Sequence, residues 1–69
     1  MAHPDYKDIG HPAVRLIEEC SELIKVLSKG MRFGWDNHHP KRKSTNLEEA
    51  EMEFRDVQEA WGDFMRLFP

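Results

Sequence analysis

The feature that most constrains this chain is an apolar stripe near its C-terminus, which repeats at alternating spacings of three and four residues. The stripe consists of Leu47, Ala50, Phe54, Val57, Trp61, Phe64 and Phe68. Such spacing gathers apolar side chains on one face of an α-helix. We therefore expect a helix over about 46–67. Its N-cap is either Asn46 or Thr45, because a glutamate follows each of them three residues later.

A second stripe with the same spacing occurs earlier in the chain. It consists of Ala13, Leu16, Cys20, Leu23 and Leu27, and Ile17, Ile24 and Met31 widen it. Pro12 suits the first turn of a helix and Gly30 suits its end, so we expect a helix over about 12–29. The single cysteine, Cys20, excludes an internal disulfide. Its place on the stripe predicts packing and not nucleophilic chemistry.

The remaining segments show no apolar period. We expect residues 1–11 to form a flexible N-terminal arm and residues 30–45 a long loop, with 12–69 forming one helical domain. The loop contains the histidine pair His38 and His39, but adjacent side chains point in different directions and no partner at metal spacing accompanies them. A zinc site is therefore not expected. The basic run Lys41–Lys43 is interpreted mainly as part of a solvated loop, with contact to phosphates as the alternative.

Two helices and no strand predict an all-α helical hairpin. With 69 residues, the chain is short for a stable independent core. Two apolar stripes this wide cannot cover each other completely. We therefore expect a homodimer or homotetramer in which hairpins assemble into a four-helix bundle.

Composition narrows the range of partners. The net charge is −3, so no general attraction to nucleic acid is expected. No apolar run is long enough to cross a membrane, and the first residues lack the features of a signal peptide. One cysteine fits a reducing compartment. Together these features predict a cytoplasmic protein that is not bound to membranes.

Two pairs of carboxylates carry the most chemical information. Glu19 with Glu22, and Glu53 with Asp56, are each three residues apart. At about 100° per residue, each pair lies about 70° and 130° to the same side of its apolar stripe. Like charges at this spacing repel unless a cation lies between them, and Mg²⁺ prefers carboxylate oxygens. The alternative is a solvated acidic face, since the second predicted helix also contains Glu48, Glu49, Glu51 and Glu59.

The run Glu18-Glu19-Cys20-Ser21-Glu22, followed by Glu53-Phe54-Arg55-Asp56, resembles the EExxE and ExxD motifs of the MazG-like all-α nucleoside triphosphate pyrophosphohydrolases. The local sequence Arg32-Phe33-Gly34 and Asn46 are also similar to members of that superfamily. The resemblance covers roughly residues 14–61. Relatives generally continue into a further helix, so the resemblance implies a minimal or truncated member.

The resemblance implies hydrolysis of a nucleoside triphosphate to the monophosphate and pyrophosphate. Mg²⁺, or Mn²⁺ in its place, would be held by Glu19, Glu22, Glu53 and Asp56. Glu18 and Glu19 would be the catalytic residues, with Glu18 orienting or deprotonating the attacking water.

Four further residues are candidates for substrate binding. Lys29 and Arg32 carry charges suited to phosphates, or they complement the helix dipole. Trp35, with Phe33, either stacks on a base or plugs the end of the core. Asn46 either contacts the base, as the resemblance implies, or caps the second helix. Two other functions stay open: a non-catalytic relative that binds nucleotide or metal, and a helical interaction module with a solvated acidic face.

Overall fold

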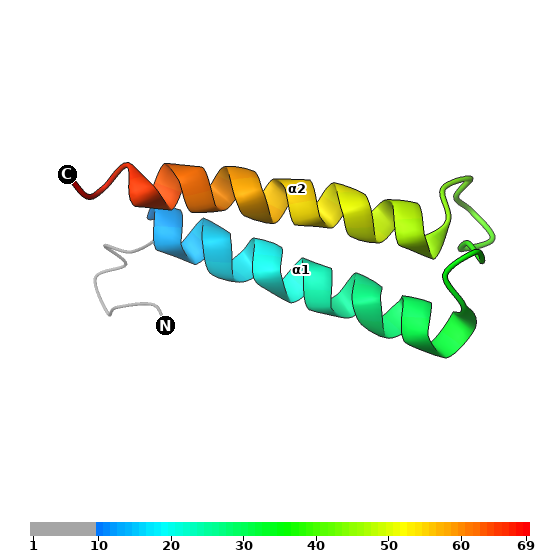
Figure 1. The fold of residues 1–69 in the computed structure, drawn as a ribbon. Coiled ribbons are helices and arrows are strands. Elements are labelled where there is room, and N and C mark those ends of the chain that lie inside the picture. The colour runs from blue at the N-terminus through cyan, green and yellow to red at the C-terminus, as the bar shows by residue number, and fades with distance from the viewer. Residues whose placement is uncertain (1–9) are drawn as a thin grey trace.

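The computed structural model describes residues 10–69, which form two helices joined by a loop (Figure 1). Helix α1 spans Pro12–Phe33 and helix α2 spans Asn46–Met65. The two helices lie side by side and run in opposite directions along most of their length. The part of the chain described contains no strand, which confirms the predicted all-α hairpin. Most of the arm predicted over 1–11 lies outside the described residues.

Helix α1 starts as predicted and ends later than predicted. His11 is its N-cap, with Nδ1 accepting a hydrogen bond from the N–H of Ala13 at 3.0 Å, and Pro12 occupies the first turn. The predicted end at residue 29 is wrong, because the helix continues through Gly30 to Phe33. Gly34 ends it instead: its φ of 94° suits glycine, and its N–H donates to the carbonyl of Gly30 at 2.9 Å.

The loop between the helices is tied to both of them. The Trp35 ring packs against Gly30, which is buried. The N–H of Leu47 donates to the carbonyl of Trp35 at 3.0 Å. Asn46 contributes two more bonds, from its backbone N–H to the carbonyl of Asn37 at 2.7 Å and from its side-chain Nδ2 to the carbonyl of Gly34 at 2.8 Å. These bonds fix the loop on the start of α2.

We expect Gly30→Ala to destabilise the protein, although alanine is the better helix former. A Cβ at this position would overlap the Trp35 ring. Overpacking of this kind costs about 1–3 kcal/mol, which outweighs a gain of about 1 kcal/mol in helix propensity. Thermal and urea unfolding measure the change. Gly62→Ala is the matched control, because a Cβ there meets nothing within 4 Å and the variant should be more stable than the native chain. A stabilised Gly30→Ala variant would contradict the packing described.

Helix α2 begins with a complete capping box. The N–H of Glu48 donates to Thr45 Oγ1 at 3.1 Å, and the N–H of Thr45 donates to Glu48 Oε1 at 2.9 Å. Of the two predicted N-caps, Thr45 is therefore the one used, and Asn46 is the first residue of the helix. The helix ends at Met65, two residues before the predicted boundary.

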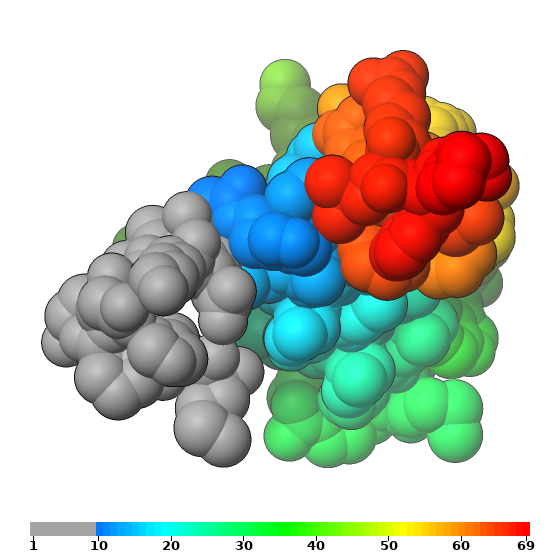
Figure 2. Space-filling view, turned by 90° about the vertical axis from the view of Figure 1, so that its left-hand side faces the viewer, coloured from blue at the N-terminus to red at the C-terminus, as the bar shows by residue number. Residues whose placement is uncertain are grey.

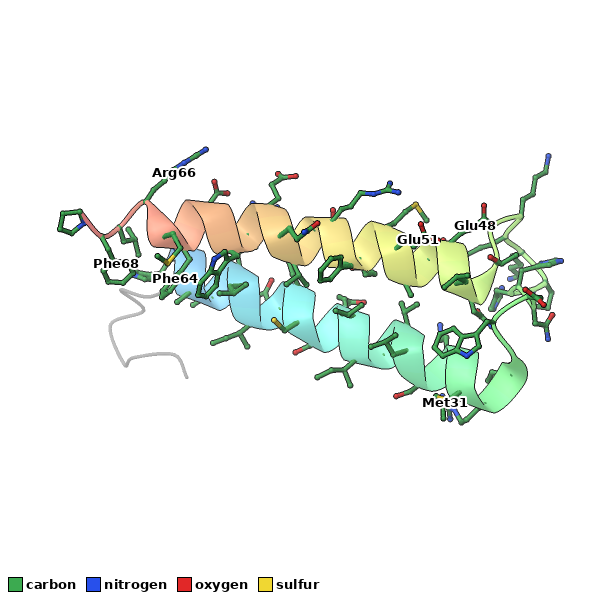
Figure 3. All side chains as sticks on the ribbon, in the orientation of Figure 1. Met31, Glu48, Glu51, Phe64, Arg66 and Phe68 are labelled. Atoms are coloured by element: carbon green, nitrogen blue, oxygen red, sulfur yellow. The ribbon has the colours of Figure 1, made fainter. Side chains whose placement is uncertain are left out.

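The core of the hairpin is small. Within residues 10–69, the only buried apolar side chains are those of Ala50 and Ala60. Large apolar side chains remain in solvent: Ile24 is 64 % exposed and Phe54 is 51 % exposed. Met31 lies on the side of α1 away from α2 (Figure 3). Both apolar stripes therefore extend beyond the contact between the two helices.

Charged side chains hold the open end of the hairpin. Arg15 of α1 reaches across to α2, with Nη1 2.8 Å from Asp63 Oδ2 and Nη2 3.4 Å from Glu59 Oε1. At the same end, the last residues of the chain lie beside the first turn of α1 (Figure 2). Neither helix of the region described has the length and the apolar character needed to cross a membrane.

Candidate metal site

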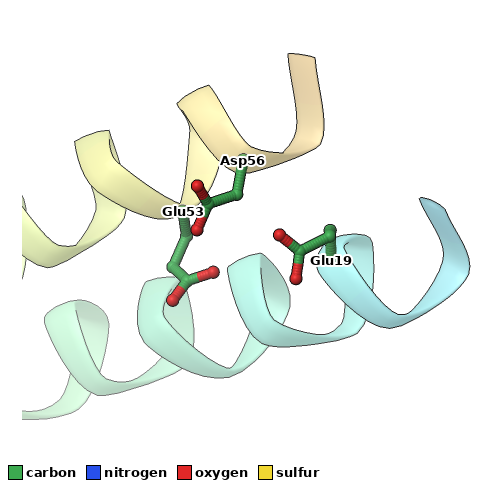
Figure 4. A group of neighbouring side chains, drawn as sticks. All are labelled: Glu19, Glu53 and Asp56. Carbon is green, nitrogen blue, oxygen red and sulfur yellow. The ribbon is translucent and has the colours of Figure 1, made fainter. Parts of the chain in front are cut away.

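Three carboxylates from the two helices converge on one point. Glu19 comes from α1, and Glu53 and Asp56 come from α2 (Figure 4). One oxygen of each carboxylate lies within 4.8 Å of one oxygen of each of the others, and all three residues are half-buried. This spacing is compatible with oxygens that share a single divalent cation. Two helices thus supply three of the four predicted ligands to one small volume.

Helical geometry explains the convergence. Glu53 and Asp56 are three residues apart and are therefore neighbours on the surface of α2. Glu19 lies opposite them because the antiparallel packing of the hairpin fixes the register of α1. Arg15, one turn before Glu19, holds this register through its ion pair with Asp63, two turns beyond Asp56.

The three carboxylates form a patch of negative charge. The pKa of Glu53 is raised above its ordinary value of 4.5, first by burial and then by the negative charge of Asp56 and of other nearby carboxylates: Glu19, Glu22 and Glu49. Among residues 10–69, no lysine or arginine lies within ion-pair distance of Glu19, Glu53 or Asp56. A hard cation with several oxygen ligands would remove this repulsion, so the donor set fits Mg²⁺ or Mn²⁺.

The two other predicted active-site residues lie at the edge of this group. Glu22 is exposed and lies outside the set of three, yet it is close enough for its charge to raise the pKa of Glu53. Glu18 is exposed on α1 and also lies outside the set. The role of Glu22 as a fourth ligand and that of Glu18 beside the attacking water stay predictions.

The predicted substrate-binding residues fall into two groups. Trp35 and Asn46 have structural roles, since one packs on Gly30 and the other anchors the loop. Lys29 is half-buried and lines a cavity next to the loop, whereas Arg32 is exposed with its guanidinium 5.4 Å from the centre of the Phe33 ring. Contact of any of the four with a nucleotide stays a prediction.

Sequence reasoning missed a polar cluster between the loop and α2. Glu49 Oε1 lies 2.6 Å from Arg42 Nη1, and Glu49 Oε2 accepts a hydrogen bond from Ser44 at 2.6 Å. The hydrogen bond from Ser44, with that from Arg42 and the positive charges of Arg42 and Lys29, lowers the pKa of Glu49. Arg42 is therefore paired, and not simply part of a solvated basic run. The aperiodic loop offered no signal for this contact.

Comparisons of the chain with protein-family models, with curated proteins and with solved structures find no match in any of the three. The site itself therefore carries the case for a function.

The raised pKa of Glu53 predicts a specific dependence of stability on pH. In the folded state Glu53 binds its proton more tightly than in the unfolded state, so its contribution favours folding at low pH and is lost as the pH rises from 4.5 through the raised pKa. Glu49 and Glu48 act in the opposite direction, because folding lowers their pKa. Comparison with Glu53→Gln isolates the effect of Glu53. In metal-free buffer, Glu53→Gln should be more stable than the native chain, and the difference in free energy of unfolding should increase as the pH rises from 4.5 through the raised pKa of Glu53.

With saturating Mg²⁺ we expect the opposite: the native chain should gain stability relative to Glu53→Gln as the pH rises, because metal ligation requires the carboxylate form. Thermal unfolding at a series of pH values, with and without Mg²⁺, measures both effects. If the gain in stability of Glu53→Gln were independent of pH, the raised pKa of Glu53 would be contradicted.

Proposed function

We propose that this protein is a Mg²⁺-dependent nucleoside triphosphate pyrophosphohydrolase, which cleaves a nucleoside or deoxynucleoside triphosphate to the monophosphate and pyrophosphate. The observation that supports this best is the convergence of Glu19, Glu53 and Asp56 from two helices. The resemblance of the EExxE and ExxD motifs to MazG-like enzymes supports the choice of reaction. A solvated acidic face would not require half-buried carboxylates in which burial, and then mutual repulsion, raises the pKa of Glu53.

In this proposal the carboxylates position the reaction. Glu19, Glu53 and Asp56 hold the cation, and Glu22 becomes a fourth ligand by a change of rotamer, which its exposure permits. Bound Mg²⁺ would polarise a phosphoryl oxygen and lower the pKa of a water. Glu18 orients that water or accepts its proton. The carboxylates lie on helices, which hold them in the geometry that an in-line displacement needs.

Positive charge lies further along the same side of the hairpin. Lys29 follows Glu22 by seven residues, so it lies on the same face of α1 at a distance of about 10 Å along the axis. Arg42 and Lys29 line one small hollow together with Glu49, so the two cations lie close together. Lys29, with Arg32 nearby on α1, is suited to neutralise the phosphates that extend from the metal.

We propose further that two hairpins form a four-helix bundle, as a homodimer or as half of a homotetramer. The exposed apolar residues follow heptad spacing on both helices: Ile17, Ile24 and Met31 on α1, and Leu47, Phe54, Trp61 and Phe68 on and after α2. Shallow hollows interrupt this face, one between Ile24, Leu27 and Met31 and another between Leu16, Phe54 and Trp61. Side chains of a second copy can fill such hollows.

The proposed interface leaves the metal site open. Ile24 follows Glu22 by two residues, and Phe54 precedes Asp56 by two residues. A separation of two residues on a helix corresponds to about 200°, so Ile24 and Phe54 point away from Glu22 and Asp56, and Glu53 lies about 100° around α2 from Phe54. Dimerisation through the apolar face therefore does not block access of a nucleotide to the carboxylates.

Pyrophosphate release from each common ribo- and deoxyribonucleoside triphosphate, assayed with and without Mg²⁺, tests the function. We expect release from at least one nucleotide with Mg²⁺ and none after chelation. Mg²⁺-dependent binding of a nucleotide without product would indicate a non-catalytic relative instead. Stability that is indifferent to Mg²⁺, together with no nucleotide binding, would indicate an interaction module.

A further inference from the structure

A cavity of about 370 Å³ lies where the loop meets the two helices. The loop and the end of α1 supply most of its wall, through Phe33, His38, His39 and Pro40. Lys29 and Asn46 line it from the helices. This volume falls within the range of about 300–1,000 Å³ that small-molecule sites occupy. Its wall combines the apolar rings of Phe33 and Pro40 with five polar side chains, which suits a ligand that is flat and has polar edges.

Part of the wall is already engaged in holding the loop. Asn37 donates from Nδ2 to the carbonyl of Phe33 at 3.2 Å and accepts at Oδ1 from the N–H of His38 at 2.9 Å. Asn46 uses its Nδ2 on Gly34. Phe33, in contrast, is 61 % exposed, and its contact with the Arg32 guanidinium leaves much of the ring accessible. Phe33 and Pro40 therefore offer apolar surface to a flat ligand.

The two histidines are held in different tautomers. His38 Nδ1 lies 2.9 Å from the carbonyl of His39, and because a carbonyl only accepts, this nitrogen carries the proton. His39 Nδ1 accepts from the N–H of Lys41 at 3.1 Å, so in the neutral ring the proton is on Nε2. Toward residues 10–69, the pair thus offers one acceptor without a hydrogen bond, His38 Nε2, and one such donor, His39 Nε2. The Watson–Crick edge of every nucleobase also presents both an acceptor and a donor.

The cavity and the carboxylates lie on the same side of the hairpin. Lys29 follows Glu22 by seven residues on α1, and Asn46 precedes Glu53 by seven residues on α2. Seven residues correspond to nearly two full turns and about 10 Å. The sugar and phosphate chain of a nucleotide are suited to span this separation, and Lys29 lies beside that path.

We propose that this cavity is the base subsite of the enzyme. The base of the nucleoside triphosphate stacks on Phe33 beside Pro40, its edge meets the His38 and His39 imidazoles, and its phosphates extend past Lys29 to the carboxylates. The inference rests on the proposed function. Of the two rings that were candidates for stacking, it assigns this role to Phe33 alone, because the Trp35 ring packs against Gly30.

Kinetics of Phe33→Ala test the subsite. Loss of a stacking ring should raise KM for the nucleotide by about 5- to 100-fold and leave kcat within about twofold, because the ring binds the base and not the reacting phosphates. Phe33→Tyr should restore the native KM. Met52→Ala is the matched control, since it removes another exposed apolar side chain, one that lies on α2 and does not line the cavity. Thermal unfolding should show that all three variants fold like the native chain.

A binding experiment tests the subsite without catalysis. In calorimetry without Mg²⁺, the monophosphates of all the common bases are titrated into the native chain, Phe33→Ala and Glu53→Gln. We expect Phe33→Ala to weaken binding of the preferred monophosphate by the same factor as KM, and Glu53→Gln to leave it unchanged.

The possible results separate the two proposals. Pyrophosphate release with an unchanged KM in Phe33→Ala would overturn the subsite and leave the proposed function intact. If no nucleotide is hydrolysed, the function fails, and the calorimetry alone decides the subsite. Equal binding by the native chain and Phe33→Ala, or no binding by either, would then overturn it.

Discussion

Replacing Glu53 by glutamine and Asp56 by asparagine together is expected to lower Mg²⁺-dependent pyrophosphate release by about 10³-fold or more. The two carboxylates supply two of the three oxygens that converge within 4.8 Å, and their amides are neutral and bind Mg²⁺ poorly. Charge stabilisation by a metal contributes several kcal/mol to a transition state, and about 4 kcal/mol corresponds to about 10³ in rate. Steady-state kinetics at saturating Mg²⁺ measure the loss.

Stability separates lost catalysis from lost folding in this double variant. Removal of two repelling charges should make the metal-free protein at least as stable as the native chain, and Mg²⁺ should no longer raise its melting temperature. Glu51→Gln is the matched control. Glu51 lies on the same helix, is exposed, and among residues 10–69 makes a single surface ion pair of 4.0 Å, with Arg55. An inactive Glu51→Gln variant, or an active double variant, would contradict the assigned site.

Placing a charge on the apolar face is expected to dissociate the protein into monomers. Ile24→Glu and Phe54→Glu each introduce a carboxylate in the middle of an exposed heptad stripe, on α1 and α2 respectively. Burial of an unpaired charge in an interface costs several kcal/mol, so we expect the dissociation constant of the dimer to rise by at least about 100-fold. Analytical ultracentrifugation over a range of concentrations measures the change.

The monomeric variants should also be much less stable than the assembled protein. A hairpin whose buried apolar side chains are Ala50 and Ala60 has little core of its own within the region described. Met52→Glu is the control, because Met52 is two residues from Phe54 and faces about 200° away from it. A native chain that sediments as a monomer at all concentrations would contradict the proposed bundle.

The course of the backbone could largely be predicted from the sequence. In the stripes through Leu23 and Val57, apolar residues recur with the period of an α-helix. Many residues along each helix contribute to this pattern, so a single deviating residue does not hide it. The placement of Glu53 and Asp56 beside the apolar stripe followed from the same period, and so did the placement of Glu19 on the corresponding side of α1.

The end of α1 and the pairing of Arg42 were not predicted, because both depend on contacts between residues that are distant in the sequence. Both Gly30 and Gly34 are natural helix ends, and the choice between them is made by Trp35, whose ring occupies the space that a side chain at position 30 would need. The pairing of Arg42 with Glu49 likewise depends on the path of an aperiodic loop. Nothing in the local sequence encodes either contact.

The central claim is that Glu19, Glu53 and Asp56 hold the cation on which a nucleotide is hydrolysed. Crystals grown with Mn²⁺ and a nucleotide whose α–β bridge cannot be hydrolysed test it most directly, because Mn²⁺ gives an anomalous signal. We expect an anomalous peak at bonding distance from one oxygen of each of the three carboxylates, with a phosphate oxygen completing its shell. A bound nucleotide with Mn²⁺ elsewhere, or no peak between these carboxylates at saturating Mn²⁺, would contradict the claim.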